Sequence, residues 1–151
     1  MVHTKISSTN PYANWSIQEL PGLTQQQQLQ LQALGINSTL DLLQSANTTN
    51  LKQQLANQLR IKVQYLNKWV AMANLARIPS VGCQYCGLLL HAGIASVAQL
   101  SQTPIHRLHR NIMRLQVATM QRRDLCPCVD EVQKWVEQAK LIRAAELSAG
   151  N

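Results

Sequence analysis

Four cysteines are the residues whose type and spacing best suit chemistry in this sequence. Cys83 and Cys86 form a C-x-x-C pair, and Cys126 and Cys128 flank a proline. Both pairs are expected at helix N-termini, where the positive end of the helix dipole lowers the pKa of a thiol. Four thiolates form a complete tetrahedral ligand set for zinc. Three interpretations remain open: a zinc site, uncoordinated thiols with Cys86 packed as a small hydrophobic residue, and a disulfide or iron–sulfur ligation.

Arginines form the second chemically distinctive group. The chain carries a formal charge of +7 with a pI near 9.6, which favours attraction to polyanions. Much of this excess falls in residues 105–123, a segment without a single acidic residue. This segment predicts a basic surface for phosphates or for an acidic protein surface, and its arginines are Arg107, Arg110, Arg114, Arg122 and Arg123.

The remaining polar residues do not suggest catalysis. The chain has only seven acidic residues, and none lies at helical spacing from a histidine, as a catalytic acid–histidine pair would. No glycine-rich phosphate loop occurs, and the C-x-x-C pair lacks the βαβ context of thiol oxidoreductases. We therefore expect a binding protein and no enzyme.

Length and hydropathy indicate a protein without a membrane span. The 151 residues are 46% hydrophobic, which is enough to form a core. No apolar run approaches the roughly 18 residues of a membrane span, and the first residues lack the apolar centre of a secretion signal. We therefore expect a cytoplasmic protein, in which cysteines stay reduced unless they bind a metal or do redox chemistry.

An internal repeat sets the architecture. The 25 residues that start at Leu20 align without gaps with those that start at Ile78, and residues 63–77 align with residues 129–143. Between these blocks the second copy is longer, and the extra length falls in the arginine-rich segment. We expect four parts: a flexible N-terminal tail (1–16), a first repeat (17–77), a second repeat with an extended basic helix (78–143) and a C-terminal helix end and tail (144–151).

Local signals predict that both repeats are helical. Capping residues at Thr24, Ser38 and Ser96 predict helix starts near residues 25, 39 and 97, and a further helix should begin near residue 83. Gly35 and Gly93 follow apolar helical stretches and should close them in a left-handed conformation. No convincing alternation of strand residues is present. The expected fold is all-α, with both units in one compact helical domain.

The two repeat starts resemble a known motif. LPGLT from Leu20 and IPSVG from Ile78, each followed by a helix that ends in Gly-Ile, are similar to the hairpin of helix-hairpin-helix proteins. The chain most resembles small duplicated proteins, common in photosynthetic bacteria, whose domain has no known function. In the wider family, hairpin backbone N–H groups bind a DNA phosphate. The resemblance implies contacts at Gly22, Thr24, Ser80 and Gly82, although each hairpin keeps only one of the two usual glycines.

Two functions follow from these observations. The first is sequence-independent nucleic-acid binding, with DNA as the nominal ligand, through the basic helix and the hairpin backbone. The alternative is a protein–protein adaptor or scaffold with a structural cysteine site that could hold zinc, and no nucleic-acid role. Charge and resemblance favour the first, and the altered hairpins favour the second.

Overall fold

The computed structural model describes residues 5–6, 12–120 and 127–149. This part of the chain is mostly helical, which confirms the all-α prediction. Its helices are α1 (Gln25–Ala33), α2 (Thr39–Ser45), α3 (Thr49–Leu59), α4 (Val63–Ala76), α5 (Gly82–His91), α6 (Val97–Ser101), α7 (Ile105–Met120) and α8 (Val129–Ala149). A 3₁₀ turn η1 (Ile17–Glu19) precedes them, and the two-residue strands β1 (Lys5–Ile6) and β2 (Ala13–Asn14) pair antiparallel. Within this described part, no helix is long and apolar enough to cross a membrane.

The predicted helix starts are confirmed, and side-chain caps explain those of α1, α2 and α6, whereas α5 begins without a side-chain cap. Thr24 forms a full capping box: its hydroxyl accepts from the Gln27 N–H, and the Gln27 side chain accepts from the Thr24 N–H. The Ser38 and Ser96 hydroxyls each accept from the backbone N–H three residues on. Each cap satisfies an N–H group that the first helical turn leaves unpaired.

Glycines end α1 and α5 in the same way. Gly35 and Gly93 adopt φ angles of +84° and +95°, as predicted. The following isoleucines, Ile36 and Ile94, donate their N–H groups to the carbonyls of Leu31 and Leu89 at 2.9 Å. This pattern is the Schellman motif, in which a left-handed glycine lets two N–H groups fold back onto the last carbonyls of the helix.

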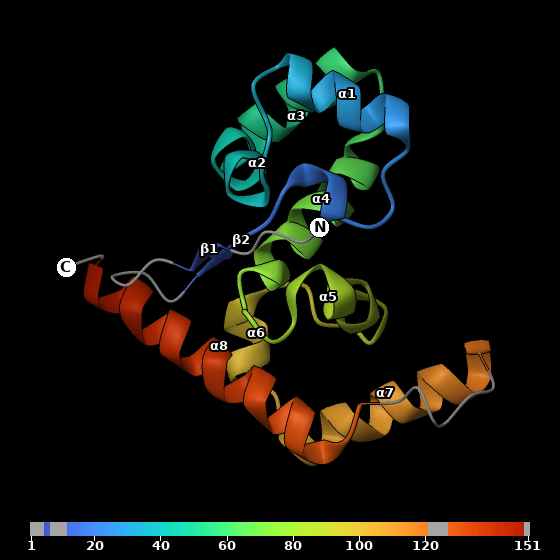
Figure 1. Cartoon of the computed structure of the whole chain (residues 1–151), viewed down its shortest axis with the longest axis vertical. Coiled ribbons are helices and arrows are strands. Elements are labelled where there is room, and N and C mark those ends of the chain that lie inside the picture. Colours follow the sequence, from blue (N-terminus) through green and yellow to red (C-terminus); the bar gives the residue numbers. More distant parts are fainter. Residues whose placement is uncertain (1–4, 7–11, 121–126, 150–151) are drawn as a thin grey trace.

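The helices follow one another in matching order in the two halves. Helices α1 to α4 occupy residues 25–76, and α5 to α8 occupy residues 82–149. Figure 1 shows α1–α3 at one end of the molecule and α5–α8 at the other, with α4 between them. Both α4 and α8 bury a tryptophan, Trp69 and Trp135, and the ring of Trp135 lies 5.0 Å from that of Tyr85 in α5.

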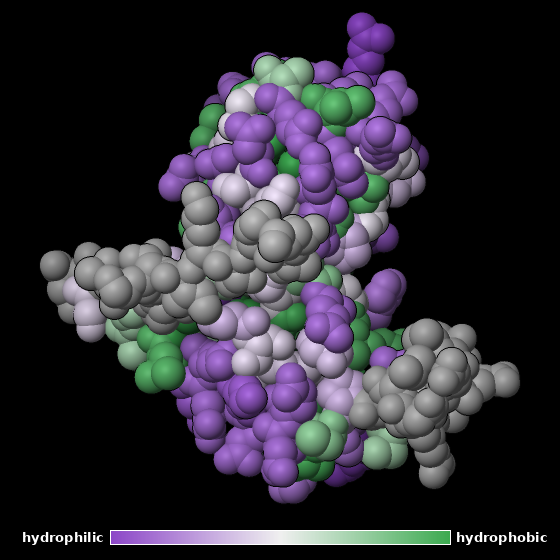
Figure 2. All heavy atoms as spheres, in the orientation of Figure 1, coloured by the Kyte–Doolittle hydropathy of each residue, from purple (hydrophilic) through white to green (hydrophobic). Residues whose placement is uncertain are grey.

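The core runs through both halves. Leu31, Leu66, Leu89 and Ile112 are fully buried members of one continuous hydrophobic cluster. Helices α4 and α5 pack against each other at the middle of this cluster. Hydrophilic residues cover much of both halves on the face seen in Figure 2.

The segment before η1 also packs on this core. Within the region expected to be a flexible tail, Ala13 is fully buried, and its N–H donates to the Arg77 carbonyl at 2.8 Å. The indole N–H of Trp15 donates to the carbonyl of Ala76 at 2.7 Å. The packed part of the chain therefore begins before residue 17.

Candidate functional site

Helix α7 presents one basic face and one apolar face. Arg107, Arg110 and Arg114 are spaced three and four residues apart, which places them on the same side of the helix. All three are exposed, whereas Leu108 and Ile112 are buried against the rest of the second half. Apolar burial therefore fixes the orientation of α7 and turns its arginines toward solvent.

No acidic side chain neutralises this face within the described residues. Helix α7 contains neither Asp nor Glu, and the described ion pair, Arg77 with Glu146, lies elsewhere in the molecule. We name Arg107, Arg110 and Arg114 the α7 basic face. The predicted residues Arg122 and Arg123 lie outside the described residues.

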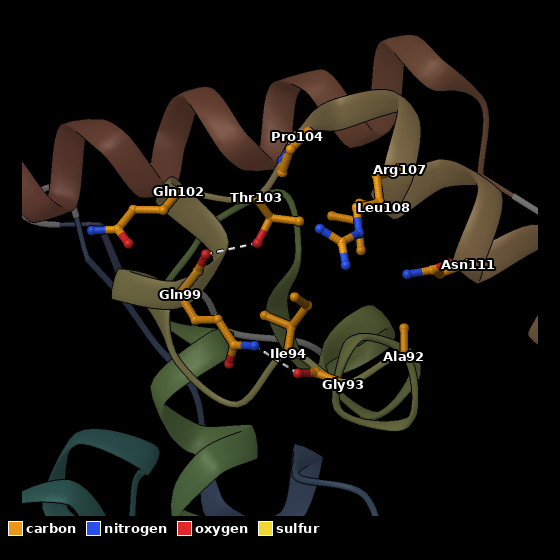
Figure 3. Close-up of a pocket in the computed structure, with 10 residues that line it drawn as sticks. All are labelled: Ala92, Gly93, Ile94, Gln99, Gln102, Thr103, Pro104, Arg107, Leu108 and Asn111. Atoms are coloured by element: carbon orange, nitrogen blue, oxygen red, sulfur yellow. Dashed lines mark hydrogen bonds between the residues drawn. The ribbon is translucent and has the colours of Figure 1, made fainter.

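A polar pocket of about 400 Å³ lies at the start of α7 (Figure 3). The guanidinium of Arg107 and the amide of Asn111 point into it. Gln99 and Thr103 form its opposite wall, where the Thr103 hydroxyl donates to the Gln99 carbonyl at 2.7 Å. No carboxylate side chain lines the pocket. Arg107 and Asn111 therefore supply N–H donors suited to an oxyanion such as a phosphate.

The first predicted hairpin is open to solvent. Gly22 is exposed and adopts a φ of +88°, a conformation that favours glycine. The backbone N–H of Thr24 is already bonded to the Gln27 side chain at 2.9 Å. At this hairpin the capping box uses the backbone donor of Thr24, and Gly22 remains accessible.

The second predicted hairpin is closed by the protein itself. The Ser80 N–H donates to Gln138 Oε1 at 3.0 Å, and Gln138 Nε2 donates to the Ser80 hydroxyl at 2.9 Å. Gly82 is buried, its N–H donates to Ile78 at 2.9 Å, and its Cα faces the indole ring of Trp15. The backbone donors that phosphate binding would require at Ser80 and Gly82 are thus occupied, and Glu19 lines the same hollow.

The cysteines of α5 are less acidic than their helix position suggests. Burial, followed by the neighbouring Cys86 and by Glu19, raises the pKa of Cys83 to about 12. Burial likewise raises the pKa of Cys86 to about 12, and this side chain is fully buried in the core. The expected lowering of the thiol pKa was wrong because loss of hydration outweighs the helix dipole here. At neutral pH both groups are protonated thiols.

The zinc hypothesis can be followed for three of its four cysteines. Cys83 and Cys86 lie in the first two turns of α5, and Cys128 is exposed directly before α8. Cys126 lies outside the described residues. No group of three or more metal-binding side chains occurs in the part of the chain that the structure describes. Zinc ligation by all four cysteines stays a prediction.

Two features of the molecule escaped the sequence interpretation. Gln138 and Trp15 close the second hairpin from 58 and about 67 residues away, and no local pattern marks such contacts. Tyr65 and Lys68 of α4 line a large groove beside the first hairpin. Their spacing with Trp69 marks one helix face and is a signal that the sequence does carry.

Comparison with known proteins identifies a family. The family model described as "Domain of unknown function (DUF4332)" matches residues 21–142. No curated protein and no solved structure shows a significant match to the chain.

Proposed function

Because the chain belongs to the DUF4332 family, whose function is unknown, we propose from its own residues that it binds nucleic acid without sequence specificity. The α7 basic face carries this proposal. Three exposed arginines on one acid-free helix form a row of cations, and Arg107 also reaches into a pocket of N–H donors. Arginines placed in this way neutralise backbone phosphates, which carry no sequence information.

The protein has a non-catalytic role in this proposal, and its two halves are duplicated helix-hairpin-helix units. The matching order of helices, the paired serine caps and the paired left-handed glycines support the duplication. Only the first hairpin, at Gly22, is accessible to a backbone phosphate. In this proposal the α7 basic face is therefore the main contact of the nucleic acid, and the second hairpin makes no contact with it. A cytoplasmic location accords with the free thiols of Cys83 and Cys86.

A salt titration tests the proposal. Binding of the full chain to a labelled DNA duplex is measured by fluorescence anisotropy from low to physiological salt. We compare the chain with a variant in which Arg107, Arg110 and Arg114 are changed to alanine. The slope of log K against log salt is about −0.9 per phosphate neutralised, so the variant should lose up to about three units of slope.

A control with the same loss of charge makes the test specific. Lys62, Lys134 and Lys140 are exposed lysines outside α7, and changing them to alanine also removes three charges. This control should keep most of the affinity. Equal losses of affinity in both variants would show that binding depends on net charge and not on the α7 basic face. An absence of binding at low salt would overturn the proposal.

A protein–protein adaptor is the second candidate, and the closed second hairpin favours it. Gln138 forms hydrogen bonds with the backbone N–H and the hydroxyl of Ser80. One of the two hairpins expected to bind phosphate therefore stabilises the fold instead. The α7 basic face would then bind an acidic protein surface. This candidate predicts no affinity for duplex or single strands beyond a nonspecific background, and it retains a structural role for the cysteines.

A further inference from the structure

A groove of about 600 Å³ lies between α4, α5 and the first hairpin. One wall comes from α4, where Tyr65, Lys68, Trp69 and Met72 follow the i, i+3, i+4, i+7 spacing of a single helix face. The facing wall comes from the end of α5, and Gly22 lies at the margin. We name this cavity the Tyr65 groove.

An exposed aromatic ring distinguishes the groove. Tyr65 is 53% exposed, although most other large apolar residues of α4 are buried. Trp69, one turn further along the helix, is 4% exposed and forms part of the floor. An uncovered ring above an apolar floor offers a flat surface on which a planar group can stack.

The groove is lined by basic residues and by no acidic residue. Lys68 and His91 are exposed at its sides, and no carboxylate side chain lines it. Neither residue forms an ion pair within the described part of the chain. The groove therefore complements a ligand that joins a planar apolar group to an anion.

The groove is also close to the α7 basic face along the chain. Leu90 and His91 line the Tyr65 groove, and the next residues, Ala92 and Gly93, line the pocket that holds Arg107. The C-terminal end of α5 thus contributes to both cavities.

From this arrangement we propose that the Tyr65 groove binds an unpaired nucleotide, with the base against Tyr65 and the phosphate at Lys68 and His91. A paired base is covered by its neighbours and has no free face for the ring, whereas an unpaired base does. The volume lies in the range of cavities that hold small ligands. The inference rests on the proposed function and adds to it a preference for single strands.

Binding measurements on the full chain test the groove separately from α7. Anisotropy with a labelled oligothymidine strand and with a labelled duplex is measured for Tyr65→Ala, Tyr65→Phe and Lys68→Ala. Tyr65→Ala should weaken strand binding about 5- to 150-fold, the usual effect of losing one stacked base. Tyr65→Phe should keep the affinity because it keeps the ring, and the duplex should bind all three variants nearly as well as the parent.

Matched controls separate the groove from general effects. Asn67→Ala changes an exposed residue of α4 outside the groove, and Lys134→Ala removes one exposed lysine on α8. Both should leave strand affinity within about twofold of the parent. Thermal unfolding of every variant checks that Tyr65→Ala, a change at an exposed position, leaves the protein folded.

The outcomes for the groove and for α7 differ. Unchanged strand binding in Tyr65→Ala, with weaker binding in the α7 variant, would overturn the proposal of a nucleotide site in the Tyr65 groove. It would leave the proposed function in place. No binding to strand or duplex would overturn the proposed function. In that case a titration with adenosine monophosphate decides whether the Tyr65 groove binds a nucleotide. Shifts of the Tyr65 and Trp69 NMR signals support a free-nucleotide site, and their absence overturns it.

Discussion

At the scale of single residues, two glycines show how one backbone conformation can have different costs. Gly82 and Gly93 both have positive φ angles, +52° and +95°. A methyl group added at Gly93 would meet no atom within 4 Å, but one added at Gly82 would lie 2.6 Å from the indole of Trp15. At position 93 a glycine is needed only because of the positive φ angle. At position 82 it is needed also because the indole of Trp15 leaves no room for a Cβ atom.

This difference gives a paired stability prediction. Gly93→Ala should lower the free energy of unfolding by about 1–2 kcal/mol through the strained φ alone. Gly82→Ala should cost about 1–3 kcal/mol more because the indole ring must move. Urea unfolding of both variants measures the difference, and equal losses would show that Trp15 does not pack against Gly82.

The thiols of α5 show how burial overrides local sequence. Their pKa rises from 9.0 to about 12, so the thiolate fraction near pH 8 falls about a thousandfold. The thiolate is the form that reacts with alkylating reagents. The C-x-x-C spacing alone therefore overstated the reactivity of these cysteines.

A short reaction with iodoacetamide at about pH 8 should therefore label Cys128, which is exposed, well before Cys83 and Cys86. Mass spectrometry of peptides locates the label, and the chain in urea, where burial is lost, provides the reference. Labelling of Cys83 in the folded chain as fast as in urea would contradict the raised pKa.

At the scale of elements, the structure separates what the sequence could predict from what it could not. The caps at Thr24 and Ser38 act within three residues, so their pattern sufficed to place α1 and α2. The bonds between Ser80 and Gln138 join residues 58 apart, and such a pairing depends on how α5 and α8 pack. The predicted phosphate contact at Ser80 came from the motif and took no account of α8.

The link between this hairpin and α8 can be tested with two glutamines. Gln138→Ala removes both bonds to Ser80 and should lower the free energy of unfolding by about 1–3 kcal/mol, since Ser80 is partly buried. Gln133→Ala on the same helix removes an exposed bond to Glu137 and should cost within about 0.5 kcal/mol. Chemical unfolding measures both, and equal costs would mean that Gln138 adds nothing beyond an ordinary surface contact.

At the scale of the whole molecule, the repeat does not divide the protein into two independent folding units. One hydrophobic cluster includes residues of both halves, and α4 packs directly on α5. Cutting between the halves would expose Leu75 and Ile78, which are both fully buried. The two halves of the chain therefore share a single core.

We accordingly expect one cooperative unfolding transition. Urea curves followed by tryptophan fluorescence and by far-ultraviolet circular dichroism should have the same midpoint, because the tryptophans and the helices lose their packing together. Two separated midpoints, or a stable fragment of residues 1–77, would show that each half folds alone.

The contacts of Trp15 have a consequence for where this domain begins. The stretch that is recognisable by family resemblance starts at residue 21, but Trp15 donates to Ala76 and covers Gly82 from outside that stretch. A protein shortened to the residues matched by the family would lose the indole of Trp15. The region around Ala76 and Gly82, where the two halves meet, would then be exposed. The boundary of resemblance and the boundary of the folded body are thus different places on the same chain.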